Sequence, residues 1–336
     1  MNLLRAEKNI YLKGPYAALP ERVMSNQAVL EWMHSDQNPA VVSFSTGIRN
    51  RRWVNDDQAC SDLAVLAAEK LFAEKPLERT KINQIILTTI SGDYVSPPTS
   101  PLVQYRLGIE NTGAFDIGAA CAGFVVGLHT SAAIAQGSMG SVLLIASEVR
   151  SKFLNKESFA TSVLFGDGAA ACIVSSDAED AEFRFIASAL FADGEVSDTV
   201  STPAGGSRLP ASQCTNPEQF YITIKENTAL FVKAVQGMVF GAESFLKKLG
   251  LNSTDIQWLV PHQGNKNLVM SVAKQLGFPD ERVIKTVEET GNTSGSSVGI
   301  ALDELRKNAQ LQSKDKVLLV AAGGGGIAAC ALLEVL

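Results

Sequence analysis

Long apolar runs and targeting features are scarce in this sequence. No uninterrupted apolar stretch approaches the roughly 18 residues that a membrane-spanning helix needs, and the N-terminal stretch MNLLRAEKNIYLKG lacks the apolar centre of a secretion signal. We therefore expect a cytoplasmic protein with no membrane partner.

Charge is also sparse, and no long basic run is present. Only 19% of the 336 residues are charged, the formal charge is -6, and the densest basic cluster is RNRRW at 49–53. An acidic surplus of this kind disfavours binding to nucleic acid or to anionic membranes. The apolar fraction of 46% indicates a well-buried globular protein, and the length indicates two domains or two halves.

Cysteine pairs, metal motifs and nucleotide motifs are missing. The five cysteines form an odd set without a CxxC pair, which disfavours a disulfide framework and a zinc site. Neither GxxxxGK[ST] nor a GxGxxG that opens a helix after a first strand occurs. These absences disfavour a nucleotide-binding loop, and we expect most of the cysteines to be small buried residues.

The residues that are present alternate between strand and helix patterns. Short, β-branched apolar runs predict buried strands at 82–90, 141–149, 256–263 and 316–323, and helical patterns cover 121–137 and 295–308. Gly137 stands where a helix-stopping glycine would be. This alternation predicts an α/β protein.

Similar segments recur in the two parts of the chain. VLLIAS at 142 matches VLLVAA at 317, and GAAAC at 168 matches GIAAC at 326. Matching elements in the same order favour an internal duplication with pseudo-two-fold symmetry. The polar stretch SSDAEDAEF marks the junction, so we predict halves at 1–178 and 179–336 that share an interface. The irregular segment 191–215 is expected to cover the functional site.

Histidine is scarce, which narrows the search for a catalytic base. His34 and His129 suit a surface position and a helix face, respectively. His262, in WLVPHQGNKN, follows an apolar strand and a proline. Functional sites of α/β proteins gather at the carboxyl ends of strands, so His262 is the candidate.

Cys121, in FDIGAACAGF, stands among small residues where a strand gives way to a helix. At a helix start the macrodipole lowers a thiol pKa from about 8.5 towards neutrality, which would make Cys121 a nucleophile. Cys172 and Cys330 lie in equally apolar runs, so the sequence context alone leaves packing and reactivity both open.

Two glycine-containing stretches complete the candidates. Asn292, in ETGNTSGSSVG, suits either a turn before a helix or an amide that contacts a ligand. Four consecutive glycines, 323–326, follow a predicted strand and require a bare backbone. Either two elements cross tightly there, or a backbone amide serves as an oxyanion donor.

Taken together, the motifs STGIRNR, DIGAACAGF, FGDGAAACIV, VPHQGNKN and GNTSGSSV carry a family resemblance. With Cys121, His262 and Asn292 in that order, the chain resembles the thiolase-fold condensing enzymes, and most closely the chain-initiating β-ketoacyl-acyl-carrier-protein synthases III. The resemblance implies an α/β fold with five αβαβα layers built from two duplicated halves.

The resemblance also implies a reaction. Cys121 would accept an acyl group from a thioester, with the amides of Cys121 and Gly325 holding the oxyanion. His262 and Asn292 would then bind the carbonyl oxygen of a malonyl thioester during decarboxylation. The enolate would attack the acyl-cysteine and give a β-ketoacyl thioester, without a metal or organic cofactor.

Partners follow from the same resemblance. They are an acyl-coenzyme A or acyl-carrier-protein donor, a malonyl thioester on acyl carrier protein, and a second copy of the chain whose 91–104 loop reaches towards the pocket. Lys266, Lys247, Lys248, Lys225 and Lys233 are the basic residues expected near an acidic carrier. The expected substrate contacts are Thr46, Arg49, Ser96, Phe159, Asn265 and Lys266.

The chain departs from the family pattern where coenzyme A would bind. In the family, a tryptophan and an arginine sandwich the adenine ring; by the resemblance, this chain has Val41 and Phe159 in their places. It also has Ser45 where the family has another arginine. The nearby residues expected to make these contacts instead are Arg51, Arg52 and Trp53. Ser96 replaces an aromatic residue that limits acyl length. We therefore expect a donor other than plain acetyl-coenzyme A, with a longer or functionalised acyl group.

Two other readings stay open at this stage. An acyltransferase of the same fold would pass the acyl group from Cys121 to an oxygen or nitrogen acceptor without decarboxylation, and a scaffold protein would keep only the fold. The identity and length of the donor, its carrier, and the choice between fatty-acid and specialised metabolism are also open.

Overall fold

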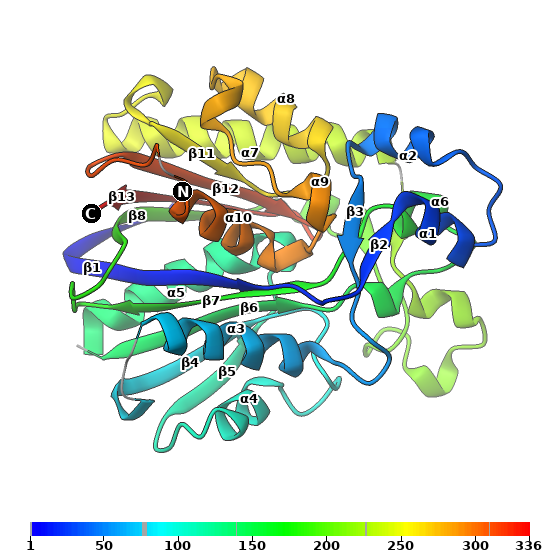
Figure 1. Ribbon diagram of the computed structural model, residues 1–336, viewed down its shortest axis with the longest axis horizontal. Helices are drawn as coiled ribbons and strands as arrows, with labels where there is room; N and C mark the ends of the chain where they lie inside the picture. The colour runs from blue at the N-terminus through cyan, green and yellow to red at the C-terminus, as the bar shows by residue number, and fades with distance from the viewer. Residues whose placement is uncertain (1, 76–78, 139, 226, 309) are drawn as a thin grey trace.

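The computed structural model describes residues 2–75, 79–138, 140–225, 227–308 and 310–336. In this part of the chain a nine-stranded sheet has the order β11-β12-β13-β8-β1-β7-β6-β4-β5 (Figure 1). Its strands are β1 (Asn2–Ala18), β4 (Ile82–Thr88), β5 (Gly113–Ile117), β6 (Ser141–Glu148), β7 (Gly168–Ser175), β8 (Phe183–Ala192), β11 (Trp258–Pro261), β12 (Lys316–Gly323) and β13 (Ile327–Val335).

The strand order is symmetric about the central pair of β1 and β8. Moving outwards on one side, β7 and β6 are antiparallel and β4 is parallel to β6; on the other side, β13 and β12 are antiparallel and β11 is parallel to β12. The repeated segments occupy equivalent strands, VLLIAS in β6 and VLLVAA in β12. The predicted duplication in an α/β fold is confirmed. The division at 178/179, which falls between β7 and β8, stays a prediction.

Helices form three layers around the strands. α5 (Gly123–Ser138) and α10 (Ser297–Arg306) lie in the middle, α3 (Cys60–Glu74) and α4 (Ser100–Arg106) on one outer side, and α7 (Asn227–Leu249) and α8 (Lys266–Leu276) on the other (Figure 1). Successive β12 residues face different cores: Leu319 packs into the central cluster, while Leu318 and Val320 pack under α7 and α8. Burial on both faces explains why the strands read as continuous apolar runs.

Smaller elements cluster at one end of the molecule. They are β2 (Val23–Ser25), α1 (Asn26–Trp32), α2 (Pro39–Thr46), β3 (Asn50–Arg52) and α6 (Phe159–Ser162), and Figure 1 shows them together at the right. Irregular chain between β8 and α7 adds the short strands β9 (Val200–Ser201) and β10 (Thr223–Ile224), and α9 (Val287–Thr290) precedes α10.

The helix predicted over 121–137 begins and ends later than expected. Residues Ala120–Ala122 form a 3₁₀ turn, and α5 starts at Gly123. Gly137 lies inside the helix, which runs to Ser138, so the glycine does not stop it. The helix predicted over 295–308 likewise opens with a 3₁₀ turn, Ser294–Ser296, before α10.

Two helices are long and apolar enough, by length and composition, to cross a membrane. They cover 120–137 and 228–249. The first contributes Phe124, Val125 and Leu128 to the central core, and the second packs Met238 and Phe245 against the sheet. Helices packed into a protein core pass the same compositional test, so this finding is weak support for a membrane span.

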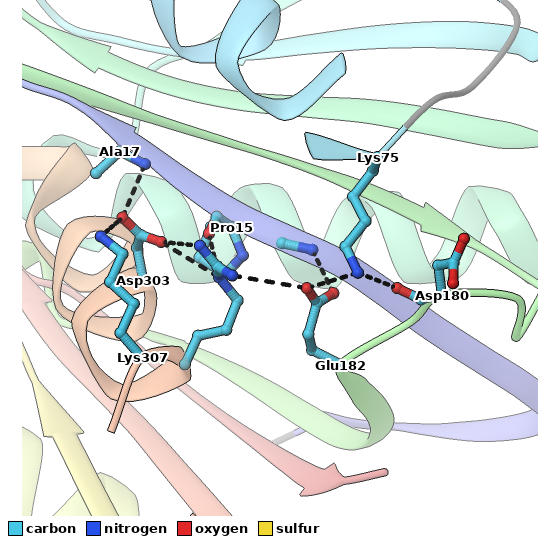
Figure 2. A network of polar contacts seen from close by, with 9 residues as sticks. Pro15, Ala17, Lys75, Asp180, Glu182, Asp303 and Lys307 are labelled. Atoms are coloured by element: carbon cyan, nitrogen blue, oxygen red, sulfur yellow. Dashed lines mark hydrogen bonds and ion pairs between the residues drawn. The ribbon is translucent and has the colours of Figure 1, made fainter. Parts of the chain in front are cut away.

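A polar network joins the two halves (Figure 2). Asp303 of α10 accepts the backbone N–H of Ala17 in β1 at 3.1 Å and pairs with Arg306 at 2.7 Å. Glu182, before β8, pairs with Lys75 beyond α3 at 3.0 Å and lies 3.8 Å from Arg306. The network thus ties α3, β1, β8 and α10 together.

Candidate active site

A cavity of about 1190 Å³ opens where β12 ends and β13 begins. Cys121, His262 and Asn292, which come from three distant parts of the chain, all line it. Residues 191–202 contribute to its wall, so the first part of the irregular segment 191–215 covers the site as expected, whereas residues 203–215 do not line the cavity. Most of the remaining wall is apolar, with Phe159, Val163, Leu164, Phe165, Phe191, Leu230, Phe231 and Phe240 among the lining residues.

Cys121 lies in the 3₁₀ turn between β5 and α5. The preceding residue, Ala120, has a φ of +45°, a left-handed conformation that non-glycine residues rarely adopt and that costs about 1–3 kcal/mol. The Cys121 Sγ lies 3.8 Å from the Ser294 Oγ and accepts a hydrogen bond from the backbone N–H of Gly324. The strained turn thereby presents the sulfur to the cavity and to two polar partners.

The expected lowering of the Cys121 pKa is wrong for this structure. The residue is partly accessible from the cavity, yet protein atoms surround the thiol and burial raises its pKa. The contacts with Ser294 and Gly324, and the charge of Arg150, oppose that rise, whereas Glu148 adds to it. Because α5 starts two residues later, desolvation of the thiol outweighs its position near a helix start.

His262 follows β11 and is buried. Its backbone N–H donates to the Val320 carbonyl at 2.8 Å, and its Nδ1 lies 2.8 Å from the Ser297 Oγ. Burial lowers the pKa of His262 to about 4, so the ring is neutral near pH 7. In the tautomer that carries its proton on Nε2, the Ser297 hydroxyl donates to Nδ1 and the Nε2–H is available to a ligand.

Asn292 is fixed by both its backbone and its side chain. Its N–H donates to the Leu164 carbonyl at 2.9 Å, and its own carbonyl accepts from Gly166 at 3.1 Å. The Oδ1 accepts the N–H of Ser294 at 2.9 Å, while the Nδ2 has no hydrogen-bond partner among the described residues. The amide nitrogen of Asn292 can therefore donate a hydrogen bond to a ligand in the cavity.

The glycine run, 323–326, contains both tight crossings and a backbone amide near Cys121. A Cβ on Gly323 would lie 2.8 Å from the Cys121 nitrogen, and a Cβ on Gly326 would lie 1.9 Å from the Asp193 carbonyl oxygen, so both are tight crossings. The amide beside the Cys121 sulfur belongs to Gly324. Gly324 is therefore a further candidate for the oxyanion donor; Gly325 lines the cavity, and its role as the donor stays a prediction.

The six expected substrate contacts divide into two groups. Thr46, Phe159 and Asn265 line the cavity, whereas Arg49, Lys266 and Ser96 do not. Arg49 pairs with Glu288 and Glu289, Lys266 pairs with Glu288 at 3.0 Å, and Ser96 is exposed on its loop. Asn265 also caps α8 by accepting the Leu268 N–H, so its side chain has a structural role as well.

Two of the three proposed substitutes for the adenine contacts, Arg51 and Trp53, are wrong, whereas Arg52 is half-buried, donates to the Pro20 carbonyl at 3.2 Å and stays a prediction. Arg51 is fully buried and donates to the carbonyls of Met24 and Val163 and to the Asn26 Oδ1. Trp53 is buried too, and its indole N–H donates to the Phe165 carbonyl at 3.0 Å. Both side chains stabilise the interior of this end of the molecule and do not face the cavity.

The basic residues expected near a carrier lie at different distances from the cavity. Lys233 lines the cavity and is exposed. Lys225 lies before α7 and pairs with Asp198. Lys247 and Lys248 lie in the last turn of α7, about 9 Å along the axis beyond Gly241, the last residue of α7 that lines the cavity.

Sequence reasoning missed three polar residues of the site: Glu148, Ser294 and Ser297. Glu148 and Ser297 are buried, and Ser294 has a φ of +51°. The available signals were a carboxylate at the end of the apolar strand SVLLIASEV and a serine-rich helix start in GNTSGSSVG.

Metal ligands are not grouped in the described part of the chain, where no cluster of three or more His, Cys, Asp or Glu could hold an ion. The five cysteines are free thiols, and Cys60, Cys172 and Cys330 are buried.

The duplicated α/β fold, with a cysteine at the head of the central helix, defines a thiolase-like acyltransferase. Two family models match the chain, 3-oxoacyl-[acyl-carrier-protein] synthase III over residues 115–194 and its C-terminal part over 246–335. The chain belongs to the β-ketoacyl-[acyl-carrier-protein] synthase III family.

Individual relatives agree with this assignment. β-Ketoacyl-[acyl-carrier-protein] synthase III of Chlamydia muridarum is 40% identical over 318 residues, which cover 94% of this chain and 96% of the relative. The enzyme of Clostridioides difficile is 37% identical over 313 residues, covering 93% and 94%. The crystal structure of the Pseudomonas aeruginosa synthase III superposes with a TM-score of 0.88 at 30% identity, covering 97% of this chain and 98% of that one.

Proposed function

We propose that this synthase III loads an acyl group onto Cys121 and condenses it with a malonyl thioester. In the first step the sulfur attacks the thioester carbonyl, the acyl–sulfur bond of the donor breaks, and the donor leaves as a thiol. The N–H groups of Cys121 and Gly324 donate to the oxyanion that forms. The observation that carries the proposal is that Cys121, His262 and Asn292 share one cavity.

In the second step, the malonyl thioester loses carbon dioxide beside His262 and Asn292. The Nε2–H of the neutral His262 and the Nδ2 of Asn292 donate to the thioester oxygen as it becomes an enolate. The enolate carbon attacks the acyl-cysteine, the carbon–sulfur bond to Cys121 breaks, and a β-ketoacyl thioester leaves. Transfer to an oxygen or nitrogen acceptor is less favoured, because it needs neither of these donors.

Acyl loading is tested by intact-protein mass spectrometry. The wild type is incubated separately with acetyl-, octanoyl- and dodecanoyl-coenzyme A, with the matching carrier-bound donors, and compared with Cys121→Ala. We expect an acyl mass increment on the wild type alone. The proposal fails if no donor gives an adduct or if Cys121→Ala gives the same adduct.

We further propose that the donor carries a longer or functionalised acyl group. The cavity is large, its wall is mostly apolar, and Phe159 lines it. By the resemblance, Phe159 stands where the family carries an arginine. Val41, in the place of the stacking tryptophan, does not line the cavity. Octanoyl or dodecanoyl adducts should form faster than acetyl adducts at equal donor concentration, and the reverse order would contradict this assignment.

An acyl carrier protein is proposed as the carrier of the malonyl group, with Lys233 and Lys266 at its docking surface. Lys233 is exposed at the cavity, and Lys266 begins α8 beside it. Lys233→Glu should raise the KM for malonyl-carrier protein, because like charges repel an acidic partner. Lys247→Glu on the same helix is the matched control and should leave that KM unchanged. Equal effects of both substitutions would contradict this docking surface.

A homodimer is proposed as well, formed along the β5 edge. β5 is the outermost strand on its side of the sheet, and Phe115 within it is exposed. Tyr94, Val95 and Tyr105 on the neighbouring segment are exposed apolar side chains. In this arrangement Ser96 would approach the partner's cavity. Sedimentation equilibrium should give twice the chain mass, and Val95→Lys should shift it towards the monomer.

We propose a cytoplasmic location, where acyl-coenzyme A and carrier-bound substrates are available. Cell fractionation should recover the protein with the soluble fraction, and recovery with membranes after a high-salt wash would contradict this location.

A further inference from the structure

A buried carboxyl group lies behind the Cys121 sulfur and has no role in the steps above. Glu148 ends β6 and is 1% exposed. Its Oε2 accepts the Ser91 hydroxyl at 2.5 Å and the Ile90 N–H at 3.4 Å, its Oε1 lies 3.5 Å from the Ser294 Oγ, and the carboxyl also accepts the backbone N–H of Gly295. An unpaired buried carboxyl is costly, so its position beside a reactive centre calls for a function.

Ser294 is the link between this carboxyl and the sulfur. Its Oγ lies 3.8 Å from the Cys121 Sγ and 3.5 Å from the Glu148 Oε1. Among the described residues it is the one side chain that is hydrogen-bonded to the sulfur. The left-handed φ of +51° and the hydrogen bond from its N–H to the Asn292 Oδ1 hold the hydroxyl between the two groups.

The groups around Cys121 and Glu148 allow these two residues to carry one negative charge between them and disfavour two. Burial raises the pKa of both Cys121 and Glu148, and the charge of Glu148 raises the pKa of Cys121 further. Arg150, two residues beyond Glu148, supplies a nearby positive charge for both. His262 is neutral across the cavity, and the buried Cys60 thiol, whose pKa is raised to about 12, stays protonated.

We propose that Cys121, Ser294 and Glu148 form a proton relay that removes the thiol proton as the sulfur attacks, without placing a second charge in the site. The proton on Sγ passes to the Ser294 Oγ as the Ser294 proton passes to the Glu148 Oε1. The S–H and the original Ser O–H break, a new Ser O–H and a carboxyl O–H form, and the negative charge of Glu148 moves through the sulfur to the group under attack. When the donor's thiolate leaves, Ser294 donates its proton to that thiolate and takes the carboxyl proton back from Glu148.

Ser294 is a catalytic residue in this scheme because it contacts the reacting sulfur. Glu148 acts through Ser294 and is a positioning residue and proton reservoir. The inference rests on the proposed function of Cys121 as the nucleophile. Its test nevertheless uses no thioester, so a failure of the relay and a failure of acyl transfer give different results.

The test is the rate of Cys121 alkylation by iodoacetamide between about pH 5 and pH 10, followed on the full chain by peptide mapping. The wild-type rate should rise in two steps, the lower one belonging to the shared proton. Glu148→Gln keeps the shape of the side chain and the contact with Ser91 but cannot take up the proton. It should remove the lower step and slow alkylation at pH 7 by at least about tenfold.

If Glu148 acts only through its charge, Glu148→Gln should change the alkylation rate in the opposite direction. If Glu148 only raises the Cys121 pKa by its charge, Glu148→Gln lowers that pKa and speeds alkylation at pH 7. An unchanged or faster rate in Glu148→Gln, or a single step in the wild type, would overturn the relay.

Two serine variants make the test independent of one substitution. Ser294→Ala breaks the link and should also remove the lower step. Ser296→Ala, from the same loop, removes a buried hydroxyl that donates to the Thr293 carbonyl at 2.9 Å and does not contact Cys121. It should retain both steps, and thermal unfolding should place all three variants in the folded state at the assay temperature.

Discussion

At the scale of single residues, the burial of His262 makes its ionisation a source of pH-dependent stability. The pKa is about 4 in the folded protein and about 6.5 in an unfolded chain, so the unfolded state binds more protons between these values. Stability contributed by the neutral ring is present above about pH 6.5 and is lost as the pH falls towards 4, amounting to roughly 3 kcal/mol.

His262→Gln should remove this dependence. The free energy of unfolding of the wild type should rise more steeply between about pH 4.5 and pH 6.5 than that of the variant, as measured by urea denaturation at several pH values. Parallel curves for the two proteins would contradict a neutral, buried His262.

Ser297 should matter for decarboxylation and not for acyl loading. Its hydroxyl, 2.8 Å from the His262 Nδ1, favours the tautomer with the proton on Nε2. Ser297→Ala should slow release of carbon dioxide from malonyl-carrier protein by about 10–100-fold, while the acyl adduct forms at the wild-type rate. A loss of acyl loading instead would place Ser297 in the first step.

The site residues that the sequence predicted are those that lie in the family motifs. Cys121, His262 and Asn292 lie at conspicuous strand ends or helix starts, and all three line the cavity. Glu148 and Ser294 were missed because their importance depends on β6 and the loop before α10 meeting behind Cys121. The pKa of Cys121 was expected in the wrong direction, because burial of its thiol depends on neighbours that are distant in sequence.

At the scale of elements, the turn that carries Cys121 packs directly on the end of β12. Gly323→Ala would place a Cβ 2.8 Å from the Cys121 nitrogen and 3.2 Å from the Ala122 nitrogen. Because backbone atoms cannot move aside without displacing the turn, the variant should lose at least about 100-fold in the rate of acyl loading.

Gly137→Ala in α5 is the matched control for that variant. A Cβ there meets no atom within 4 Å, and alanine favours a helix by up to about 1 kcal/mol over glycine. Stopped-flow acyl loading should be unchanged in Gly137→Ala. Wild-type loading in Gly323→Ala would show that β12 does not position the turn.

Strands were easier to predict than the starts of helices. β4, β6, β11 and β12 match the apolar runs because each is buried on both faces. The starts of α5 and α10 were missed by two residues because each opens with a 3₁₀ turn. Each turn includes or follows a residue with positive φ, Ala120 and Ser294, and such strain is set by tertiary contacts at the site.

At the scale of the whole molecule, Arg306 links the two sides of the polar network, because it lies 3.8 Å from Glu182 and pairs with Asp303. Its guanidinium donates to the Pro15 carbonyl at 3.1 Å, pairs with Asp303 at 2.7 Å, and lies 4.0 Å from the centre of the Tyr16 ring. Arg306→Met should lower the free energy of unfolding by about 3 kcal/mol, because Asp303 keeps a buried carboxylate with fewer partners.

Lys285→Met is a suitable control, since Lys285 makes its ion pair with the exposed Asp280. This substitution should change the free energy of unfolding, measured by urea denaturation, by no more than about 1 kcal/mol. Equal effects of the two substitutions would mean that the network does not hold the halves together.

The two-fold plan of the molecule was predictable from its repeats, because equivalent strands carry similar apolar segments. The arrangement at the cavity end was not, since Arg51 and Trp53 look like surface residues in RNRRW yet are buried. Their burial depends on hydrogen bonds to Val163 and Phe165, which are more than a hundred residues away.

The most direct measurement of the central claim is a single turnover of acyl-loaded enzyme with malonyl-carrier protein. The acyl adduct on Cys121 is followed by intact-protein mass spectrometry while released carbon dioxide is quantified. The account predicts one carbon dioxide and one β-ketoacyl thioester for each adduct lost, with no product from Cys121→Ala. Loss of the acyl group to an oxygen or nitrogen acceptor without carbon dioxide would contradict it.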